Sequence, residues 1–244
     1  SLWPDDVYRY ALYALPSDLE KAIDGTILGQ RTEAGLAPYP SRRIIEANRL
    51  LDGLELELVY LRDPLDAFIA HVNGSAVVRL NDGTDVRLGY AGKNGREYTS
   101  LGAELVKDGF ISADELSLSS IRAWARAHPA LVSAYLDRNA SYVFFTPIDG
   151  PPRGSLNVPV SAQRTLATDK AIFPRGAIVY VDTTLPMQGG GRAVFRQLMF
   201  DQDTGGAIRT AGRADIYLGM GPEAEYRAGS TRSTGQLFYF FLKQ

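Results

Sequence analysis

Two aspartates near the C-terminal end of the chain have residue types and settings suited to proton transfer. Asp203 ends one predicted strand, Asp215 lies inside the next, and Gly205 and Gly206 stand between them. A glycine pair lets the backbone turn tightly or come close to a ligand. The neighbours of Asp215 are largely apolar, and apolar surroundings disfavour the charged form of a carboxylate. A general acid working near neutral pH requires such a setting.

The same residues also have a structural interpretation. Aspartate next to glycine is common in turns, and an aspartate in a strand can simply cap a loop. Asp215 could also pair with the nearby Arg213. The residue types alone leave both interpretations open.

The composition narrows the chemistry that an enzyme of this sequence could use. The chain has no cysteine and only two histidines, His71 and His128, which excludes thiolate sites and a multi-histidine metal centre. No G-x-S-x-G elbow is present. The segment from Gly219 to Ala224 superficially fits a dinucleotide fingerprint, but we reject that interpretation because we expect a strand after it. Proton chemistry therefore falls on carboxylates, lysine or tyrosine, and no cofactor is expected.

Charge and hydropathy indicate an ordinary globular protein. The 244 residues include 26 Lys+Arg and 28 Asp+Glu, a net charge of -2, and 45% hydrophobic residues. This balance argues against a nucleic-acid groove, which normally needs a basic excess. The longest apolar run, near Leu237–Leu242, is far shorter than the roughly 18 residues of a spanning helix. The opening residues from Ser1 do not form a signal peptide, so we expect Ser1 to be an internal start.

Periodicity predicts a β-rich α+β chain in two parts, residues 1–148 and 149–244, with a linker at 149–154. We expect turns of Gly and Asn-Asp-Gly type between the strands, an exposed loop at 92–95, and little helix after residue 155. The expected helices are 42–51, 98–108, 119–127 and 129–137. The expected strands are 8–15, 54–60, 67–72, 76–80, 84–88, 142–145, 163–167, 177–182, 193–200, 214–218 and 236–243. The short strands of the second part predict a small closed barrel.

Several motifs, in order along the chain, resemble the membrane-bound lytic transglycosylase A family with its three-aspartate module. The C-terminal motifs are Ala167–Asp169, Gln202–Ile208, Arg213–Tyr217, Gly219–Ala224 and Arg227–Gly229. The N-terminal motifs are Tyr39–Arg42, Tyr90–Gly95, Ile121–Trp124 and Asn139–Phe145. The similarity runs from about Tyr8 to Lys243.

The resemblance implies a fold and a set of site residues. It implies a double-psi β-barrel in residues 149–244, to be completed by a segment upstream of this chain, and a second small β-barrel with helices in residues 1–148. A glycan strand would lie in a groove between the two. The implied catalytic acid/base is Asp215, with Asp203 and Asp169 supporting it. The implied substrate-binding residues are Asp66, Gly74, Ser75, Tyr90, Lys93, Asn94, Tyr98, Gly205, Gly206, Glu223 and Arg227.

The implied reaction cleaves the β-1,4 bond between N-acetylmuramic acid and N-acetylglucosamine in peptidoglycan and leaves a 1,6-anhydromuramoyl end. The C6 hydroxyl of the sugar attacks its own anomeric carbon, so the nucleophile is intramolecular and a single carboxyl group can donate and then accept the proton. No metal or cofactor is needed. The resemblance also implies a place on the periplasmic face of a Gram-negative outer membrane, where family members are often held by a lipid anchor that this chain does not include. A monomer is our default expectation.

Two departures from the family pattern keep other functions open. A Gly-Tyr-Tyr-x-Pro motif expected upstream is not in the sequence, and Val72–Ala76 replaces a Val-Gln-Gly-Ser-Gly segment. A non-catalytic peptidoglycan-binding or scaffold protein that retains the groove is therefore the main alternative. A third candidate is a hydrolase on a barwin-like barrel, which needs a second carboxylate to activate water.

Overall fold

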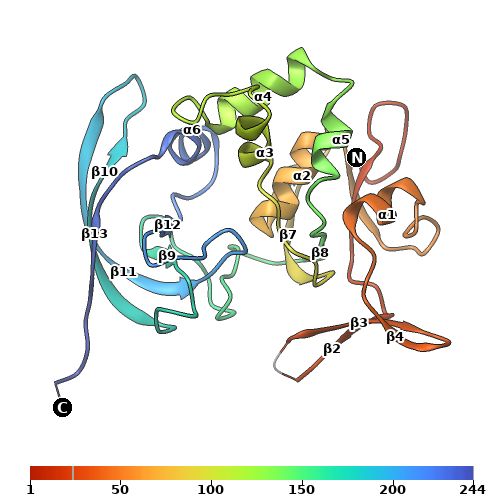
Figure 1. The fold of residues 1–244 in the computed structure, drawn as a ribbon, viewed down its shortest axis with the longest axis horizontal. Helices are drawn as coiled ribbons and strands as arrows, with labels where there is room; N and C mark the ends of the chain where they lie inside the picture. Colours follow the sequence, from red (N-terminus) through yellow and green to blue (C-terminus); the bar gives the residue numbers. More distant parts are fainter. Residues whose placement is uncertain (24, 244) are drawn as a thin grey trace. The chain divides into compact units, whose positions relative to one another are not determined.

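The computed structural model describes residues 1–23 and 25–243 and shows two compact units (Figure 1). The first unit comprises Ser1–Leu116 and Ser120–Pro152, and the second comprises Ser117–Ser119 and the residues from Arg153 onward. Each unit has hydrophobic clusters of its own. Among the described residues, no helix has the length and apolar character needed to cross a membrane.

The described helices are short, and most of them belong to the N-terminal part of the chain. They are α1 (Arg42–Ala47), α2 (Pro64–Asn73), α3 (Leu101–Lys107), α4 (Leu118–Ala127), α5 (Val132–Leu136) and α6 (Pro222–Ser230).

The strands of the first unit form three small antiparallel sheets. They are β1 (Tyr10–Tyr13) with β5 (Glu57–Leu61); β2 (Leu19–Lys21), β3 (Ile27–Thr32) and β4 (Gly35–Ala37); and β6 (Ala76–Arg79), β7 (Asp85–Lys93) and β8 (Val143–Pro147). The β6–β7 hairpin confirms the turn predicted from its Asn-Asp-Gly sequence. The sheet at residues 19–37 was not predicted, because its strands are short, have few buried residues and lack a clear alternation.

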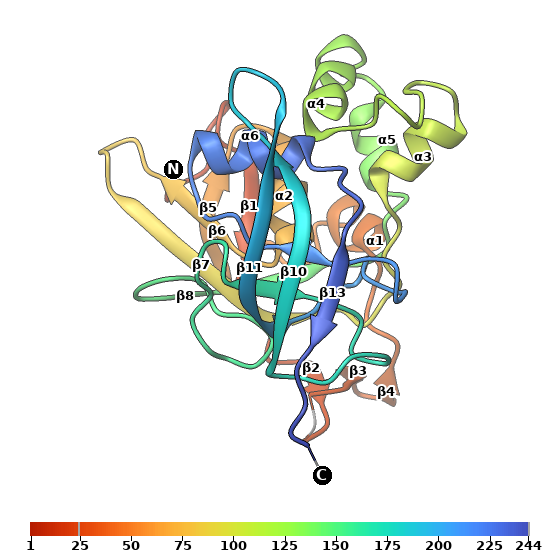
Figure 2. The same cartoon turned by 90° about the vertical axis from the view of Figure 1, so that its left-hand side faces the viewer.

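The second unit is built on one five-stranded sheet. In sheet order its strands are β12 (Asp215–Ile216), β9 (Thr165–Ala167), β11 (Arg192–Asp203), β10 (Ala177–Pro186) and β13 (Gln236–Tyr239). Figure 2 shows the long strands β11 and β10 side by side, with the shorter β13 next to β10. One face of this sheet packs on a core that includes Leu166, Val179 and Met199, which are fully buried.

The β-rich α+β class predicted from the sequence is therefore confirmed. The closed barrel expected for the second unit is not seen, because no pairing among the described residues joins β12 to β13. Within residues 1–23 and 25–243, β12 and β13 are therefore the two edge strands of the sheet.

The strand predicted at residues 67–72 is wrong, since this segment lies inside helix α2. Asp63 caps the helix by accepting a hydrogen bond from the Leu65 amide at 2.8 Å, Pro64 opens its first turn, and Gly74 ends it at a φ of 68°. A short apolar run fits both a helix and a buried strand, so the flanking caps decide. His71 therefore belongs to a helix and not to the strand assigned to it.

A second helix, α6, was missed where a strand was expected after Ala224. Pro222 at its start and Glu223 and Glu225 in its first turn are ordinary helix-start signals. The expectation that a strand directly follows Gly219–Ala224 is thus wrong, since helix α6 begins at Pro222. The strand after the helix, β13, pairs antiparallel with β10, so no parallel βαβ unit is formed.

The predicted helix at 42–51 is shorter than expected and ends at Ala47. The predicted helix at 119–127 is confirmed as α4, and those at 98–108 and 129–137 are confirmed as the shorter α3 and α5. The loop expected to be exposed at 92–95 is partly wrong: β7 runs to Lys93, and both Gly92 and Asn94 are buried.

His71 is a buried, uncharged residue of the first unit. Its Nδ1 accepts a hydrogen bond from the Val143 amide at 3.1 Å, and its ring lies 4.3 Å from the ring of Tyr142. Burial, and secondly the charge of nearby Arg42, hold the pKa of His71 well below its usual value. The neutral ring therefore helps to tie α2 to β8.

This arrangement makes the protein less stable in mild acid. Unfolded histidine binds a proton below about pH 6.5, whereas folded His71 does not, so the free energy of unfolding is fully retained above that pH and falls below it. His71→Asn keeps an acceptor near the Nδ1 position but does not titrate. We expect urea unfolding of this variant to show lower stability at pH 7 and a weaker pH dependence between pH 7 and 5. The wild-type protein is the reference, and a slope for His71→Asn equal to the wild-type slope would contradict the assignment.

Candidate active site

Strand β9 brings Asp203 and Asp215 into one row of the second unit's sheet. Ala167, the last residue of β9, pairs with Asp203 in parallel β11 on one side and with Asp215 in antiparallel β12 on the other. Two strand spacings separate the two aspartates, which places their Cα atoms roughly 10 Å apart. The fold thus brings together residues that the sequence places in successive strands.

Asp215 lies in an open, polar setting rather than the apolar one expected. Its side chain is 50% exposed. Arg213 donates from Nε to Oδ1 and from Nη2 to Oδ2, both at 3.1 Å, and also from Nη1 to the Ala207 carbonyl at 3.1 Å. The pairing with Arg213 that the sequence left open is therefore present. The adjacent Ile216 packs against the core instead.

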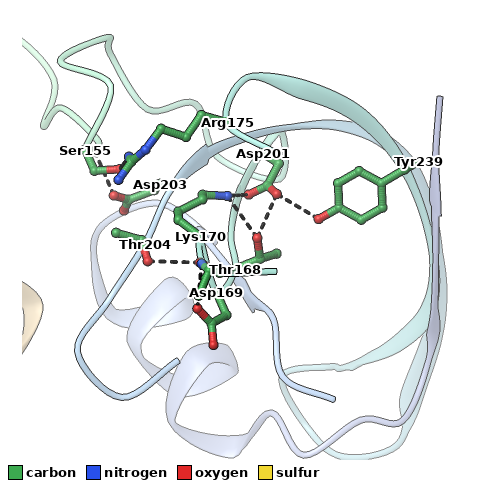
Figure 3. Close-up of polar contacts among 10 residues, drawn as sticks. Ser155, Thr168, Asp169, Lys170, Arg175, Asp201, Asp203, Thr204 and Tyr239 are labelled. Carbon is green, nitrogen blue, oxygen red and sulfur yellow. Dashed lines mark hydrogen bonds and ion pairs between the residues drawn. The ribbon is translucent and has the colours of Figure 1, made fainter. Parts of the chain in front are cut away.

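Asp203 is held by the loop that begins the second unit. Its Oδ1 accepts a hydrogen bond from the Ser155 amide at 2.8 Å, and Arg175 donates to the Ser155 hydroxyl at 3.0 Å (Figure 3). Gly154 packs so closely that an added Cβ would lie 2.9 Å from the Gln202 carbonyl oxygen and 3.3 Å from Asp203 Cγ. Only glycine fits at this position without displacing the chain.

Asp169 lies in the turn after β9 and is 8% exposed. Its Oδ1 accepts a hydrogen bond from the Ala171 amide at 3.0 Å, and its carbonyl accepts from the amides of Ile172 and Phe173. In Figure 3 its carboxylate points away from Asp201. These contacts stabilise the turn.

The predicted residues after Asp203 and on α6 have clear local roles. The Gly205 carbonyl accepts a hydrogen bond from the Ile208 amide at 3.0 Å, and the Gly206 carbonyl accepts one from Arg209 Nε at 3.0 Å. On α6, Arg227 lies 4.0 Å from Glu223, one helical turn apart, and Glu223 is exposed. The Glu223 carboxylate and the Arg227 guanidinium thus both belong to α6, which begins directly after Gly221.

The other predicted binding residues belong to the first unit. Gly74 and Ser75 lie between α2 and β6, and the Tyr90 side chain lies 3.6 Å from where a Gly74 Cβ would be. Tyr90 is exposed, while Lys93 and Tyr98 are partly buried. Asp66, in the first turn of α2, accepts a hydrogen bond from Arg122 at 2.7 Å.

Asn94 differs from these because its amide is fully engaged inside the protein. It is 2% exposed. Its Nδ2 donates to the carbonyls of Pro40 and Ala140, and its Oδ1 accepts from the amides of Tyr142 and Arg96. An amide has two donor hydrogens and two acceptor positions, so this side chain has none left over for a sugar.

A cavity of about 590 Å³ lies in the first unit, but none of the predicted site residues lines it. Its walls include Tyr13, Arg42, Asp52, Phe68 and His71. Among the described residues, no group of three or more His, Cys, Asp or Glu side chains is placed to hold a metal ion.

One buried polar cluster was missed from the sequence. Asp201 is 0% exposed and contacts Lys170, Thr168 and Tyr239 (Figure 3). The signal that could have revealed it is the alternation along β11, which places Asp201 on the same inward side as Phe195 and Met199.

Two family models match the chain. The model described as the MltA specific insert domain matches residues 1–146, and the one described as the 3D domain matches residues 164–241. A Vibrio cholerae protein called membrane-bound lytic murein transglycosylase A is 32% identical over 98% of this chain and 61% of its own length. Its Escherichia coli K12 namesake is 36% identical over 82% of this chain and 55% of its own length. The chain therefore spans well under two thirds of these curated relatives.

Solved structures with the same names share this fold. A membrane-bound lytic murein transglycosylase from Agrobacterium tumefaciens superposes with a TM-score of 0.88 at 32% identity, covering 98% of this chain and 69% of that one. Escherichia coli MltA with bound chitohexaose superposes with a TM-score of 0.78 at 30% identity, covering 98% and 68%.

The close packing of Gly154 on Asp203 can be tested by substitution. Gly154→Ala should displace the loop, lower the free energy of unfolding by about 1–3 kcal/mol and speed hydrogen exchange at the Ser155 amide. Gly212→Ala is the control, because its Cβ would meet no atom closer than 3.7 Å. It should change stability by less than about 0.5 kcal/mol. A Gly154→Ala protein with wild-type stability and Ser155 exchange would show that the loop does not hold Asp203.

Proposed function

Because this chain belongs to the MltA family of membrane-bound lytic murein transglycosylases, we propose that it is the catalytic part of a peptidoglycan lytic transglycosylase. The family assignment rests on the match of the insert-domain model to residues 1–146. We propose that its substrate is the glycan strand of peptidoglycan and that it acts in the cell envelope, on the periplasmic face of the outer membrane. The name of the chitohexaose-bound relative supports a β-1,4-linked amino-sugar ligand.

We assign the role of acid and base to Asp215. The observation that carries this assignment is the difference between the three aspartates. The side chains of Asp169 and Asp203 accept backbone amides of the turn or loop beside them, whereas Asp215 is half exposed at the start of a strand. A group that meets substrate must be reachable, and one that accepts backbone amides stabilises the local chain instead. Asp203 and Asp169 then support the site.

The proposed reaction needs no water in the bond-forming step. Protonated Asp215 gives its proton to the bridging oxygen as the bond from that oxygen to C1 of the muramic acid breaks. The C6 hydroxyl oxygen of the same sugar then bonds to C1, and its proton passes to the Asp215 carboxylate. The intramolecular attack replaces an external nucleophile and gives a 1,6-anhydro end. One carboxyl group is regenerated in each turnover.

Arg213 adds a condition to this scheme. The proton that Asp215 donates must sit on a carboxylate oxygen that Arg213 now contacts. At least one of the two hydrogen bonds must therefore open before the proton is transferred. The guanidinium is placed to bind the carboxylate again once the proton has left.

The fold and the remaining residues are assigned within the same proposal. We propose that residues 149–244 are the catalytic domain, that its open sheet belongs to a double-psi β-barrel with further strands at the β12 and β13 edges, and that residues 1–148 form the second domain. We place the exposed Tyr90, with Gly74 and Ser75 beside it, among the sugar-binding residues, since aromatic faces suit sugar rings. The protein is proposed to act as a monomer.

A second candidate is a hydrolase, because Asp203 and Asp215 share one row of the sheet. An inverting hydrolase needs two carboxyl groups about 6.5–9.5 Å apart with a water between them. Digestion of purified peptidoglycan in H₂¹⁸O separates the two reactions by mass spectrometry. We expect anhydro ends without ¹⁸O; reducing ends that carry ¹⁸O would establish hydrolysis, and binding without new fragments would leave only a glycan-binding role.

Substitution of the aspartates tests the division of roles. Asp215→Asn should lower the rate of anhydro-product release by about 10²- to 10⁴-fold, as expected for loss of a general acid and base. It should remain folded, because an exposed ion pair contributes at most about 1 kcal/mol. Asp203→Asn should lose less activity and more stability, since Asp203 accepts the Ser155 amide.

The matched control is Asp182→Asn, which removes another exposed aspartate–arginine pair from the same sheet, that with Arg196 at 3.0 Å. This variant should retain activity. A folded Asp203→Asn protein as inactive as Asp215→Asn would overturn the single-acid assignment, and full activity in Asp215→Asn would exclude it as the acid.

A further inference from the structure

A buried ion pair lies in the second unit, separate from the row of Asp203 and Asp215. Asp201 on β11 has an exposed fraction of 0%, and the Lys170 side chain that contacts its Oδ1 is 8% exposed. The second carboxylate oxygen of Asp201 accepts hydrogen bonds from Thr168 Oγ1 and from the Tyr239 hydroxyl, each at 2.7 Å. Figure 3 shows these groups converging from three segments of the chain.

Burial makes this pairing obligatory. A carboxylate out of contact with water is costly unless an opposite charge and hydrogen-bond donors satisfy it, and removing one partner leaves the other as an uncompensated charge. The Tyr239 hydroxyl is a dependable donor, because burial and the hydrogen bond to Asp201 raise the pKa of Tyr239 above its usual value. Asp201 therefore holds Lys170 and Thr168 in fixed positions.

Those two residues flank Asp169. The side chains of Thr168 and Lys170 turn inward to Asp201, while the carboxylate of Asp169, between them in the chain, points the other way (Figure 3). Anchoring both neighbours thus sets the direction of Asp169.

Thr168 also connects the ion pair to the end of β11. Its amide donates to the Asp203 carbonyl at 3.3 Å, and its carbonyl accepts from Thr204 Oγ1 at 2.9 Å. A shift of Thr168 would therefore move the backbone on which Asp203 is mounted. Asp201 pairs with Leu166 of β9, the neighbour of Ala167. The ion pair therefore lies one row of the sheet away from Asp203 and Asp215.

We propose that Asp201 is a positioning residue, which acts through Lys170 and Thr168 to hold Asp169 and Asp203 in the arrangement that the reaction uses. This inference rests on the proposed function. Loosening the contact lowers the fraction of molecules in which the aspartates are correctly placed. This loss affects turnover more than glycan binding, because Asp201, Lys170 and Thr168 are not assigned to contact substrate.

The test uses a double substitution, since either single change strands a buried charge and strongly destabilises the unit. Asp201→Asn with Lys170→Met removes both charges together, which is commonly tolerated. Lys170→Arg keeps the charge and serves as the conservative rescue. Asp182→Asn with Arg196→Met is the matched control, as it removes an exposed ion pair that joins β10 and β11.

Two readouts are needed for each folded variant. Hydrogen exchange at the amides of Ala171, Ile172 and Phe173 reports the turn that carries Asp169, whatever the protein's activity. The release of muropeptides from sacculi gives kcat and KM. For the double variant we expect about tenfold faster exchange at these amides and about a tenfold lower kcat with KM nearly unchanged. The rescue and control variants should match the wild type.

The outcomes separate the inference from the function on which it rests. Unchanged exchange and unchanged kcat in the folded double variant would overturn the positioning role. Faster exchange with a normal kcat would show that the turn is tethered but that catalysis does not depend on it, which also overturns the proposal. A wild-type protein that releases no product defeats the proposed function, while the exchange result still decides whether Asp201 fixes the turn.

Discussion

The candidate site depends on a three-residue strand, β9, that pairs on both sides. Its Ala167 joins Asp203 in β11 by parallel pairing and Asp215 in β12 by antiparallel pairing. Backbone hydrogen bonds along such a row set the separation of the two aspartates more rigidly than loop contacts could. Leu166, which is fully buried, anchors the strand in the core of the second unit. Local pairing is thus what turns two distant segments into one site.

Four aspartates of the second unit have different roles because their hydrogen-bond and ion-pair partners differ. The side chain of Asp169 accepts a backbone amide of its turn, that of Asp203 accepts an amide of the Gly154 loop, and that of Asp215 meets the exposed Arg213. Asp201, inside the core, meets Lys170. Asp215 is the most exposed of the four, and the side chains of the other three hold the protein around it. This division follows from burial and hydrogen bonding rather than from residue identity.

Sequence reasoning failed where several structures fit the same local pattern. The apolar run in α2 suits a strand as well as a helix, and only its caps, from Asp63 to Gly74, separate the two. The glycine-rich C-terminal part suggested strands throughout, although Pro222 and Glu223 mark the start of α6. Asn94 was expected on an exposed loop and instead bonds four backbone groups inside the first unit. A polar residue next to glycines suggests a surface, but buried backbone also needs polar partners.

By itself, the sequence determined the β-rich class, the absence of cysteine chemistry and the family, since composition and ordered motifs are written directly in the chain. It also left both interpretations of Asp215 open, and the tertiary structure decided that Arg213 is its partner. Only the tertiary structure decided that Asp203 and Asp215 share a row and that Asp201 is buried against Lys170. The physical reason is that strand pairing and burial join segments tens of residues apart, and that even a neighbouring pair such as Arg213 and Asp215 depends on side-chain directions, which local periodicity does not record.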